Sequence, residues 1–234
     1  MVAALFAAGL LLSACRLSVA TRTSVGTPTT TAAASAFTLP PPSTGFAGAP
    51  ATDFVGSCRH LLDGVATAAP LAADPVALVT SDRLAPIPGA AARSVFMTRP
   101  LARPEDYLAE STVEHPDVRL AALRRDGFQN GVMVDFNIGS QAASAYVLRF
   151  AGPAEAVDYM RVHVDDVCPI ALSADRLDGL PGISYLRDDH AARAIFVAGN
   201  TEVNLELCPC FDAETAATVR GWAAAVAAQL ASGR

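Results

Sequence analysis

Apolar and polar residues alternate most clearly in the last hundred residues of the chain. Every second side chain between residues 132 and 138 is apolar, which predicts a half-buried β-strand. The run 144–150 predicts a second strand. Further on, two β-rich runs are separated by Gly199-Asn200, a pair that tolerates positive φ angles. We therefore expect a β-hairpin with a two-residue turn at this point.

The second run of this expected hairpin has one apolar and one polar side. The residues that we expect to face the core are Val203, Leu205 and Leu207, and those that we expect to face water are Glu202, Asn204 and Glu206. Antiparallel sheets often leave one face in contact with solvent. The pattern therefore predicts a sheet with one solvated side.

Two amphipathic helices frame these strands. The first begins at Pro153, a residue favoured at the first helical position, and ends near Cys168. Its apolar stripe is Val157, Met160, Val164 and Val167. The second follows the capping residue Asp212, and its apolar stripe is Val219, Trp222, Val226 and Leu230. A shorter helix is expected within 115–128, stopped by Gly127, and Cys58 to Ala68 is a further helical candidate.

Strands joined by hairpins and interrupted by helices indicate the α+β class. The sequence predicts an antiparallel sheet with helices packed on one face, stapled by disulfide bonds. Three regions are expected along the chain: a signal peptide at 1–14, a lipidated N-terminus with a linker at 15–50, and one globular domain at 51–234.

The N-terminus carries an apolar run from Val2 to Leu12. This run is shorter than the roughly 20 residues of a membrane-spanning helix, but it suits the core of a signal peptide. The residues that follow, Leu12-Ser13-Ala14-Cys15, resemble the bacterial lipobox. This resemblance implies cleavage between Ala14 and Cys15 and acylation of the Cys15 thiol. Membrane lipid is thus an expected partner, and the expected location is the outer face of the plasma membrane, with some shedding from the cell envelope.

The segment that follows Cys15 predicts a flexible tether. Residues 16–50 are dominated by Thr, Ala, Ser, Pro and Gly, and they show no helical or strand period. Such a segment buries too little apolar surface to offset the entropy lost on ordering. Its clustered threonines resemble the O-glycosylated tethers of actinobacterial lipoproteins.

Charge and composition exclude two kinds of function. All 17 basic residues are arginine, so chemistry that depends on a lysine Schiff base is excluded. The net charge is -6 and the arginines are scattered. Nucleic-acid binding needs a basic stripe, so we expect no nucleic-acid partner.

Four cysteines remain after Cys15 is acylated: Cys58, Cys168, Cys208 and Cys210. An even number of cysteines in an exported protein indicates disulfide bonds. Cys208 and Cys210 are too close in sequence for an unstrained bridge with each other. We therefore expect Cys58 and Cys168 each to pair with one cysteine of the Cys-Pro-Cys motif.

The four histidines are His60, His115, His163 and His190. The runs HVDD (163–166) and DDH (188–190) could together supply oxygen and nitrogen ligands to a metal ion. The favoured interpretation places HVDD on the polar face of a helix and DDH in a turn between two strands. The chain has no G-x-S-x-G elbow, P-loop, H-E-x-x-H or dinucleotide-binding glycine motif. We expect no catalytic residue, metal or cofactor.

Two stretches carry a resemblance to a known family. They are FAGPAEAVDYMRVHVDDVC (150–168) and FVAGNTEVNLELCPCFDAETAATVRGWAAAVAAQL (196–230). Their order of elements resembles the extracellular sensor domain of a mycobacterial Ser/Thr kinase and related actinobacterial lipoproteins. The chain departs from that pattern in lacking a tryptophan before Cys168 and in its doubled Cys208 and Cys210.

The resemblance implies a disulfide-stapled domain that binds a small molecule or a protein partner and performs no chemistry. Two alternatives stay open from the residues alone. One is a carrier of lipid or another apolar envelope molecule, and the other is a hydrolase without a recognised motif.

Overall fold

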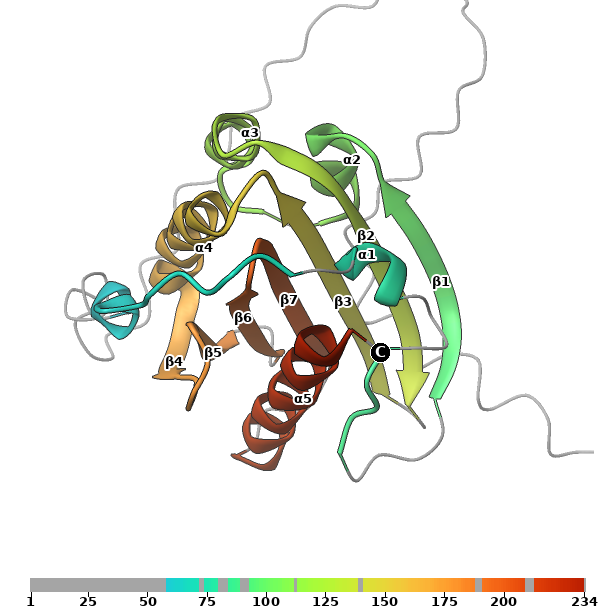
Figure 1. Cartoon of the computed structure of the whole chain (residues 1–234). Coiled ribbons are helices and arrows are strands. Elements are labelled where there is room, and N and C mark those ends of the chain that lie inside the picture. The colour runs from blue at the N-terminus through green and yellow to red at the C-terminus, as the bar shows by residue number, and fades with distance from the viewer. Residues whose placement is uncertain are drawn as a thin grey trace, which may run out of the picture. The chain divides into compact units, whose positions relative to one another are not determined.

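The computed structural model describes residues 58–71, 74–79, 84–88, 93–111, 113–138, 141–187, 191–208 and 213–233. Within these ranges, seven antiparallel strands form one sheet in the order β1-β2-β3-β7-β6-β5-β4 (Figure 1). The strands are β1 (Arg93–Leu101), β2 (Phe128–Ile138), β3 (Gln141–Phe150), β4 (Ala171–Arg176), β5 (Gly182–Arg187), β6 (Ala192–Ala198) and β7 (Thr201–Cys208). The helices are α1 (Pro75–Leu78), α2 (Pro104–Glu110), α3 (Pro116–Arg125), α4 (Pro153–Val167) and α5 (Ala213–Ser232), with 3-10 turns η1 (Arg59–Leu62) and η2 (Cys168–Ile170).

Two consecutive meanders make up the sheet. Strands β1, β2 and β3 form the first, and β4, β5, β6 and β7 form the second. The meanders join where β3 pairs with β7, and Ser144 lies opposite Glu206 at this junction. The predicted hairpin at Gly199-Asn200 is confirmed: it connects β6 to β7, and Gly199 has a φ of 58°. The α+β class and the antiparallel sheet are also confirmed.

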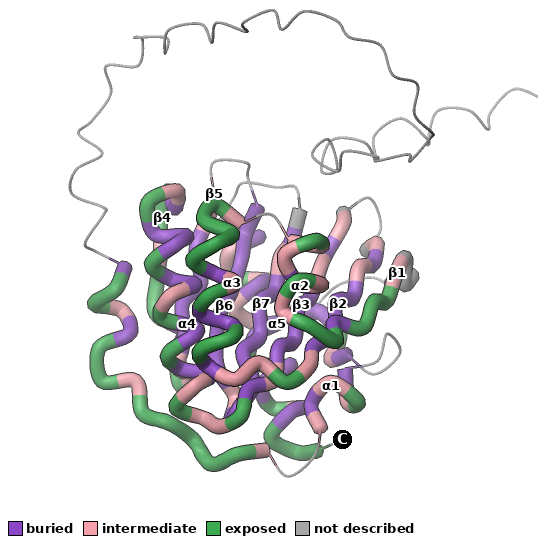
Figure 2. The backbone as a smooth tube through the Cα atoms, turned by 90° about the horizontal axis from the view of Figure 1, so that it is seen from above, coloured by how far each residue is buried: buried purple, intermediate pink, exposed green. Residues whose placement is uncertain are grey.

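Helices cover both faces of the sheet, so the prediction that they pack on one face is wrong. Helix α5 packs with Trp222 and Val226 against Val203 and Leu205 of β7 on one face. Helix α4 lies on the other face, together with α2 and α3. Figure 2 shows the buried positions concentrated in the strands and on the helix sides that face them. Each face of the sheet therefore carries its own hydrophobic core.

The second core explains why the expected solvated side is largely covered. Glu202 and Asn204 were expected to face water, but they are only 1% and 7% exposed. They lie beneath α4, which contacts β3, β6 and β7. The polar positions of β7 do lie on a second face of the sheet, as the alternation predicts. The prediction that Glu202 and Asn204 face water is wrong, because both side chains are buried.

The strongly periodic elements match their predictions. Strands β2 and β3 and helices α4 and α5 form where the patterns place them, and both apolar stripes are buried. Helix α3 ends before Gly127, whose φ of 65° suits a helix stop. The helical candidate from Cys58 to Ala68 is reduced to the short turn η1.

Among the described residues, no helix is both long enough and apolar enough to cross a membrane. Ala14, Cys15, the linker and the boundaries expected at residues 14, 15, 50 and 51 lie outside the described residues. The same holds for the cap expected at Asp212.

Candidate functional site

The sheet face beneath α4 changes from apolar to polar along its strands. In β3, Leu148 and Tyr146 are buried, whereas Ser144 is half-buried. In β7, Glu202 is buried and Glu206 is half-buried. The helices therefore cover one half of this face, and the other half is partly open to solvent.

A row of polar side chains crosses five strands on this partly open half. The backbone register aligns Asp135 of β2 with Ser144 of β3, then Glu206 of β7, Arg193 of β6 and Tyr185 of β5. Residues opposite one another in neighbouring strands lie side by side on the same face. The next residue on this face of β5 is Arg187. We call these six residues the polar strip.

Contacts within the strip hold its side chains in place. The Ser144 hydroxyl donates a hydrogen bond to Asp135 Oδ1 at 2.6 Å. Arg193 Nη2 lies 2.9 Å from Glu206 Oε1, and these side chains are 9% and 21% exposed. The strip is thus a set of partly buried groups whose positions are fixed before any ligand binds.

Two tyrosines belong to this face of the sheet: Tyr185 is part of the strip, and Tyr146 lies two residues from Ser144 on β3. Burial raises the pKa of Tyr185, and the nearby Arg193 guanidinium opposes this effect in part. Burial also raises the pKa of Tyr146, whose hydroxyl donates to the Glu110 carbonyl at 3.1 Å. Both phenols therefore stay protonated and neutral at physiological pH.

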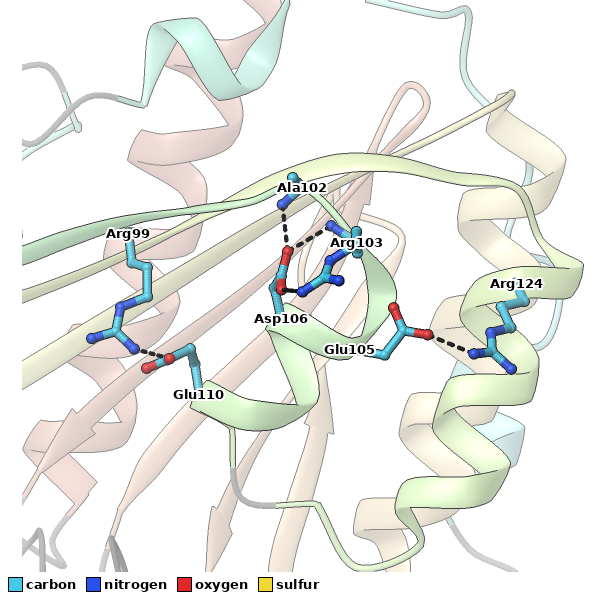
Figure 3. A network of polar contacts seen from close by, with 7 residues as sticks. All are labelled: Arg99, Ala102, Arg103, Glu105, Asp106, Glu110 and Arg124. Carbon is cyan, nitrogen blue, oxygen red and sulfur yellow. Dashed lines mark hydrogen bonds and ion pairs between the residues drawn. The ribbon is translucent and has the colours of Figure 1, made fainter. Parts of the chain in front are cut away.

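Helix α2 is held at the margin of the strip by polar contacts that Figure 3 shows. Asp106 accepts hydrogen bonds from the backbone N–H groups of Ala102 at 3.1 Å and Arg103 at 2.9 Å, which caps the helix. Glu105 pairs with Arg124 of α3 at 2.5 Å. These surface contacts fix α2, which supplies Glu110 near the strip and Tyr107 to the core beneath α4.

A second polar cluster lies in the core beneath α4. Arg119 of α3 is fully buried, and its Nη2 donates to the Tyr107 hydroxyl at 3.0 Å. Its guanidinium carbon lies 4.8 Å from the centre of the Tyr159 ring, a cation–π contact. His163 Nδ1 lies 2.5 Å from Glu202 Oε1. The cluster thus links α2, α3, α4 and β7.

Charge and burial compete in this cluster. Burial and the nearby Arg119 charge lower the pKa of His163, Glu202 opposes them, and the resulting pKa is about 4. Burial acts to lower the pKa of Arg119 as well, but Tyr159, Tyr107 and Glu202 outweigh it and raise this pKa overall. At neutral pH the cluster therefore holds a neutral imidazole and a charged guanidinium.

The prediction that HVDD (163–166) lies on the polar, exposed face of a helix is wrong for two of its residues. His163 and Asp166 are buried, and only Asp165 lies on the exposed side of α4, 3.5 Å from Arg59. Asp166 Oδ1 lies 2.5 Å from Nδ1 of His115, whose side chain is 65% exposed. The helix turns this side toward α3 as well as the sheet, so its buried face is wider than its apolar stripe.

The metal site that HVDD and DDH could form together stays a hypothesis from the sequence. The DDH run at 188–190 lies outside the described residues. Within the described part of the chain, no group of three His, Cys, Asp or Glu side chains could hold a metal ion.

Two of the cysteines lie together at the end of α4. Cys58 and Cys168 are both buried, and their thiols form a hydrogen bond. Burial raises the pKa of Cys168, and the neighbouring Cys58 raises it further. The side chain of Cys208 and the whole of Cys210 lie outside the described residues, so the pairing expected with them stays a prediction.

Sequence patterns anticipated only part of this site. The alternation in β2 and β7 marked Asp135 and Glu206 as polar positions on a sheet face. No local signal places these strands on either side of β3, or brings Arg193 and Tyr185 beside them. Arg119 carries no signal in the sequence either, since a single arginine in a short helix is usually exposed.

A scan of the sequence against models of protein families finds no match, and a search of curated proteins finds none. Among solved structures, the chain is similar to the extracellular domain of PknH from Mycobacterium tuberculosis. The sequence identity is 15% and the TM-score is 0.45, with 70% of this chain and 96% of that chain covered. We infer neither a ligand nor an activity from so distant a similarity.

Proposed function

We propose that this chain is a lipid-anchored binding domain of the cell envelope, displayed on the outer face of the plasma membrane. Two parts of the sequence support the anchor: the lipobox-like residues that end at Cys15, and the Thr-rich and Ala-rich linker to residue 50. Two or three acyl chains on one cysteine make release from a bilayer slow. The linker gives the domain reach above the lipid surface.

The polar strip is the observation that carries the binding role. Five neighbouring strands contribute half-buried or buried polar groups to one continuous row. Binding sites combine a rigid framework with a few polar groups that fix the orientation of the ligand. The central strands of a sheet supply such a framework, and the Arg193–Glu206 and Asp135–Ser144 contacts hold the polar groups on it.

The contacts of the described histidines favour binding over hydrolysis. A serine nucleophile needs a general base such as histidine within hydrogen-bond reach. Ser144 donates to Asp135, while His163 pairs with Glu202 and His115 pairs with Asp166. These pairings leave Ser144 as a hydrogen-bonding group in the strip.

The anchor and the binding role are tested together on protein purified from an actinobacterial host. We expect the membrane fraction to contain the chain, with Cys15 as its first residue and carrying acyl groups. Native mass spectrometry of this material should also show a bound molecule that is lost from the Glu206→Gln variant. An unmodified Cys15 in the soluble fraction would contradict the anchor.

The expected loss of the bound molecule from Glu206→Gln is compared with a control variant outside the strip. Asp158→Asn removes a carboxylate from an exposed ion pair with Arg161 on α4, outside the strip, and should leave the bound molecule in place. A co-purifying lipid that survives Glu206→Gln would contradict the strip as the site and support the carrier function instead.

A further inference from the structure

The charged side chains that the fold buries lie on one side of the sheet. Among the described residues they belong to α3 and its end, to α4, or to the sheet face beneath these helices: Arg119, Asp126, His163, Asp166, Arg193 and Glu202. The described core beneath α5 consists of apolar side chains, among them Phe136 and Trp222. Only the core beneath α4 therefore contains buried groups whose charge can change with pH.

His163 joins the three helices of this side to the sheet. Its Nδ1 atom lies 2.5 Å from Glu202 Oε1 of β7. Arg119 of α3 then connects to α2 through its hydrogen bond with Tyr107, and to α4 through its contact with the Tyr159 ring. We call α2, α3 and α4 the α4 layer. A change of charge at His163 acts on the contact between this layer and β7.

Other ionisable groups surround His163 on the elements that pack with α4. They are Arg119, Tyr107, Tyr159, Asp166 and Glu202 within the cluster, Arg193 and Tyr146 on the same face of β6 and β3, and His115, Arg59, Cys58 and Cys168 near the ends of the layer. Arg119 lowers the pKa of His163, and Glu202 raises it. These two groups therefore compete over a proton on the imidazole.

A proton on His163 gives this enclosed space a second cation. Nε and Nη1 of Arg119 and the Tyr159 hydroxyl already have no hydrogen-bond partner among the described residues. The imidazolium has to share the carboxylate of Glu202 with the Arg119 guanidinium. Buried charges that are incompletely paired are costly, and exposure to water removes that cost.

The order of elements allows the α4 layer to open while α5 stays in place. Helices α2 and α3 connect β1 to β2, and α4 connects β3 to β4, whereas α5 follows β7. Each face of the sheet has its own core, so separation of one layer leaves the packing of the other intact. Proteins commonly open in cooperative units smaller than the whole domain.

We propose that the α4 layer is an acid-released cover of the sheet: when His163 binds a proton, α4 separates from β7, while α5 stays packed on the opposite face. The separation uncovers apolar sheet residues, including Leu148, Ile195 and Val197, and brings Arg119 and Glu202 into water. The device is independent of the binding function proposed above, and its test gives a separate answer.

The aromatic residues report the two cores separately. All four tyrosines of the chain belong to the core beneath α4: Tyr107, Tyr146, Tyr159 and Tyr185. The single tryptophan, Trp222, belongs to the core beneath α5, where its indole N–H donates to the Ala85 carbonyl at 3.0 Å. Burial raises the pKa of each tyrosine, so an absorption change in acid reports exposure to water and not ionisation.

The first test titrates the full lipidated chain in dodecyl maltoside micelles from pH 7 to pH 4. Second-derivative absorption follows the tyrosines, and fluorescence emission follows Trp222. We expect the tyrosines to become exposed as the pH falls from about 6.5 to about 4, while the emission of Trp222 stays that of a buried indole. Tyrosine and tryptophan signals that change together, or a tyrosine signal that stays constant, would overturn the proposal.

Hydrogen exchange measured by mass spectrometry locates the opening. The pKa of His163 is about 4 in the closed layer, against an ordinary value of 6.5. After correction for the intrinsic exchange rate, the opening equilibrium of α4 peptides should therefore increase by about tenfold or more between pH 7 and pH 4.5. Peptides of α5 should keep their protection. Equal loss of protection in α4 and α5 would show one cooperative unit and would contradict a separate layer.

Two histidine variants test the trigger. His163→Gln keeps a hydrogen-bonding side chain beside Glu202 but binds no proton in this range, so it should abolish the pH dependence of exchange in α4. His60→Gln replaces an exposed histidine of η1 and should preserve it. The same acid response in His163→Gln and the unmodified chain would overturn His163 as the trigger. If His163→Gln is unfolded at pH 7, the two titrations of the unmodified chain still decide whether the layer opens separately.

Discussion

His163 Nδ1 lies 2.5 Å from Glu202 Oε1, although the two side chains are only 5% and 1% exposed. The pair joins α4 to β7 inside the second core, where Glu202 lies opposite the buried Leu148 and Val197. A buried imidazole that is neutral at pH 7 makes the stability of the domain depend on pH.

The direction of this dependence follows from the pKa of His163. Burial and the nearby Arg119 charge lower it from about 6.5 to about 4, so between these values the unfolded chain binds a proton that the folded chain does not. The folded state should therefore lose stability as pH falls from about 6.5 to about 4, by up to about 3 kcal/mol. Arg119, Tyr159, Glu202 and Asp166 are the ionisable groups around it.

Urea denaturation at pH 7, 5.5 and 4.5 measures this effect. His163→Gln should flatten the change in free energy of unfolding across this range. His60→Gln replaces an exposed histidine of η1 and should preserve the change. An equal pH dependence in His163→Gln and the unmodified chain would show that other groups control acid stability.

Arg119 provides a test of the buried cluster itself. Its Nε and Nη1 atoms and Glu202 Oε2 have no hydrogen-bond partner among the described residues. Removing one charge from such a buried set leaves the other uncompensated, so Arg119→Met should lower the free energy of unfolding by about 3–5 kcal/mol. Arg124→Met, on the exposed side of the same helix, should change it by less than about 0.5 kcal/mol.

The double variant Arg119→Met/Glu202→Gln separates charge from packing. If the missing countercharge is the main cost, the second substitution should restore part of the lost stability. Destabilisation by the sum of the two single changes would instead indicate that the two residues act independently.

The thiol contact between Cys58 and Cys168 gives a test of the disulfide pairing. We expect oxidised protein to contain a direct Cys58–Cys168 bond, because the two side chains already touch. Mapping of proteolytic peptides by mass spectrometry without reduction identifies the bond. Cys58→Ser should then lower the free energy of unfolding by about 2–5 kcal/mol. Peptides that join Cys58 or Cys168 to the Cys-Pro-Cys motif would support the pairing expected from the sequence instead.

Cys15 gives a test of the anchor that is independent of the folded domain. Cys15→Ser removes the thiol that accepts the diacylglyceryl group. In an actinobacterial host, this variant should lose incorporation of labelled palmitate and should no longer be processed at Ala14. Continued labelling of Cys15→Ser with palmitate would show that acylation occurs elsewhere.

Local periodicity made some parts of this fold predictable and others not. Strand β2 and helix α5 have regular apolar stripes that face a core, so their patterns were sufficient. Strand β4 forms an edge of the sheet and exposes most of its residues, including Leu172 at 52%, so it carries no such pattern. Edge strands are stabilised by pairing with a neighbour, which local sequence does not reveal.

The polar strip could not be predicted from the sequence for a related reason. Its row depends on β3 lying between β2 and β7, and this adjacency is a property of the whole topology. His163 was misplaced because α4 packs against both the sheet and α3, so a polar residue beside the apolar stripe is also enclosed. Burial of a polar side chain is decided by its partner, here Glu202 from β7.

The junction of the two meanders has a consequence for the order of assembly. Ser144 and Glu206 come together only when β3 and β7 pair, and these strands are far apart in sequence. Contacts between distant segments form late and slow the folding of a domain. A molecule bound across this seam would hold the two meanders together and slow their separation, so occupancy would be visible as a longer lifetime of the native state.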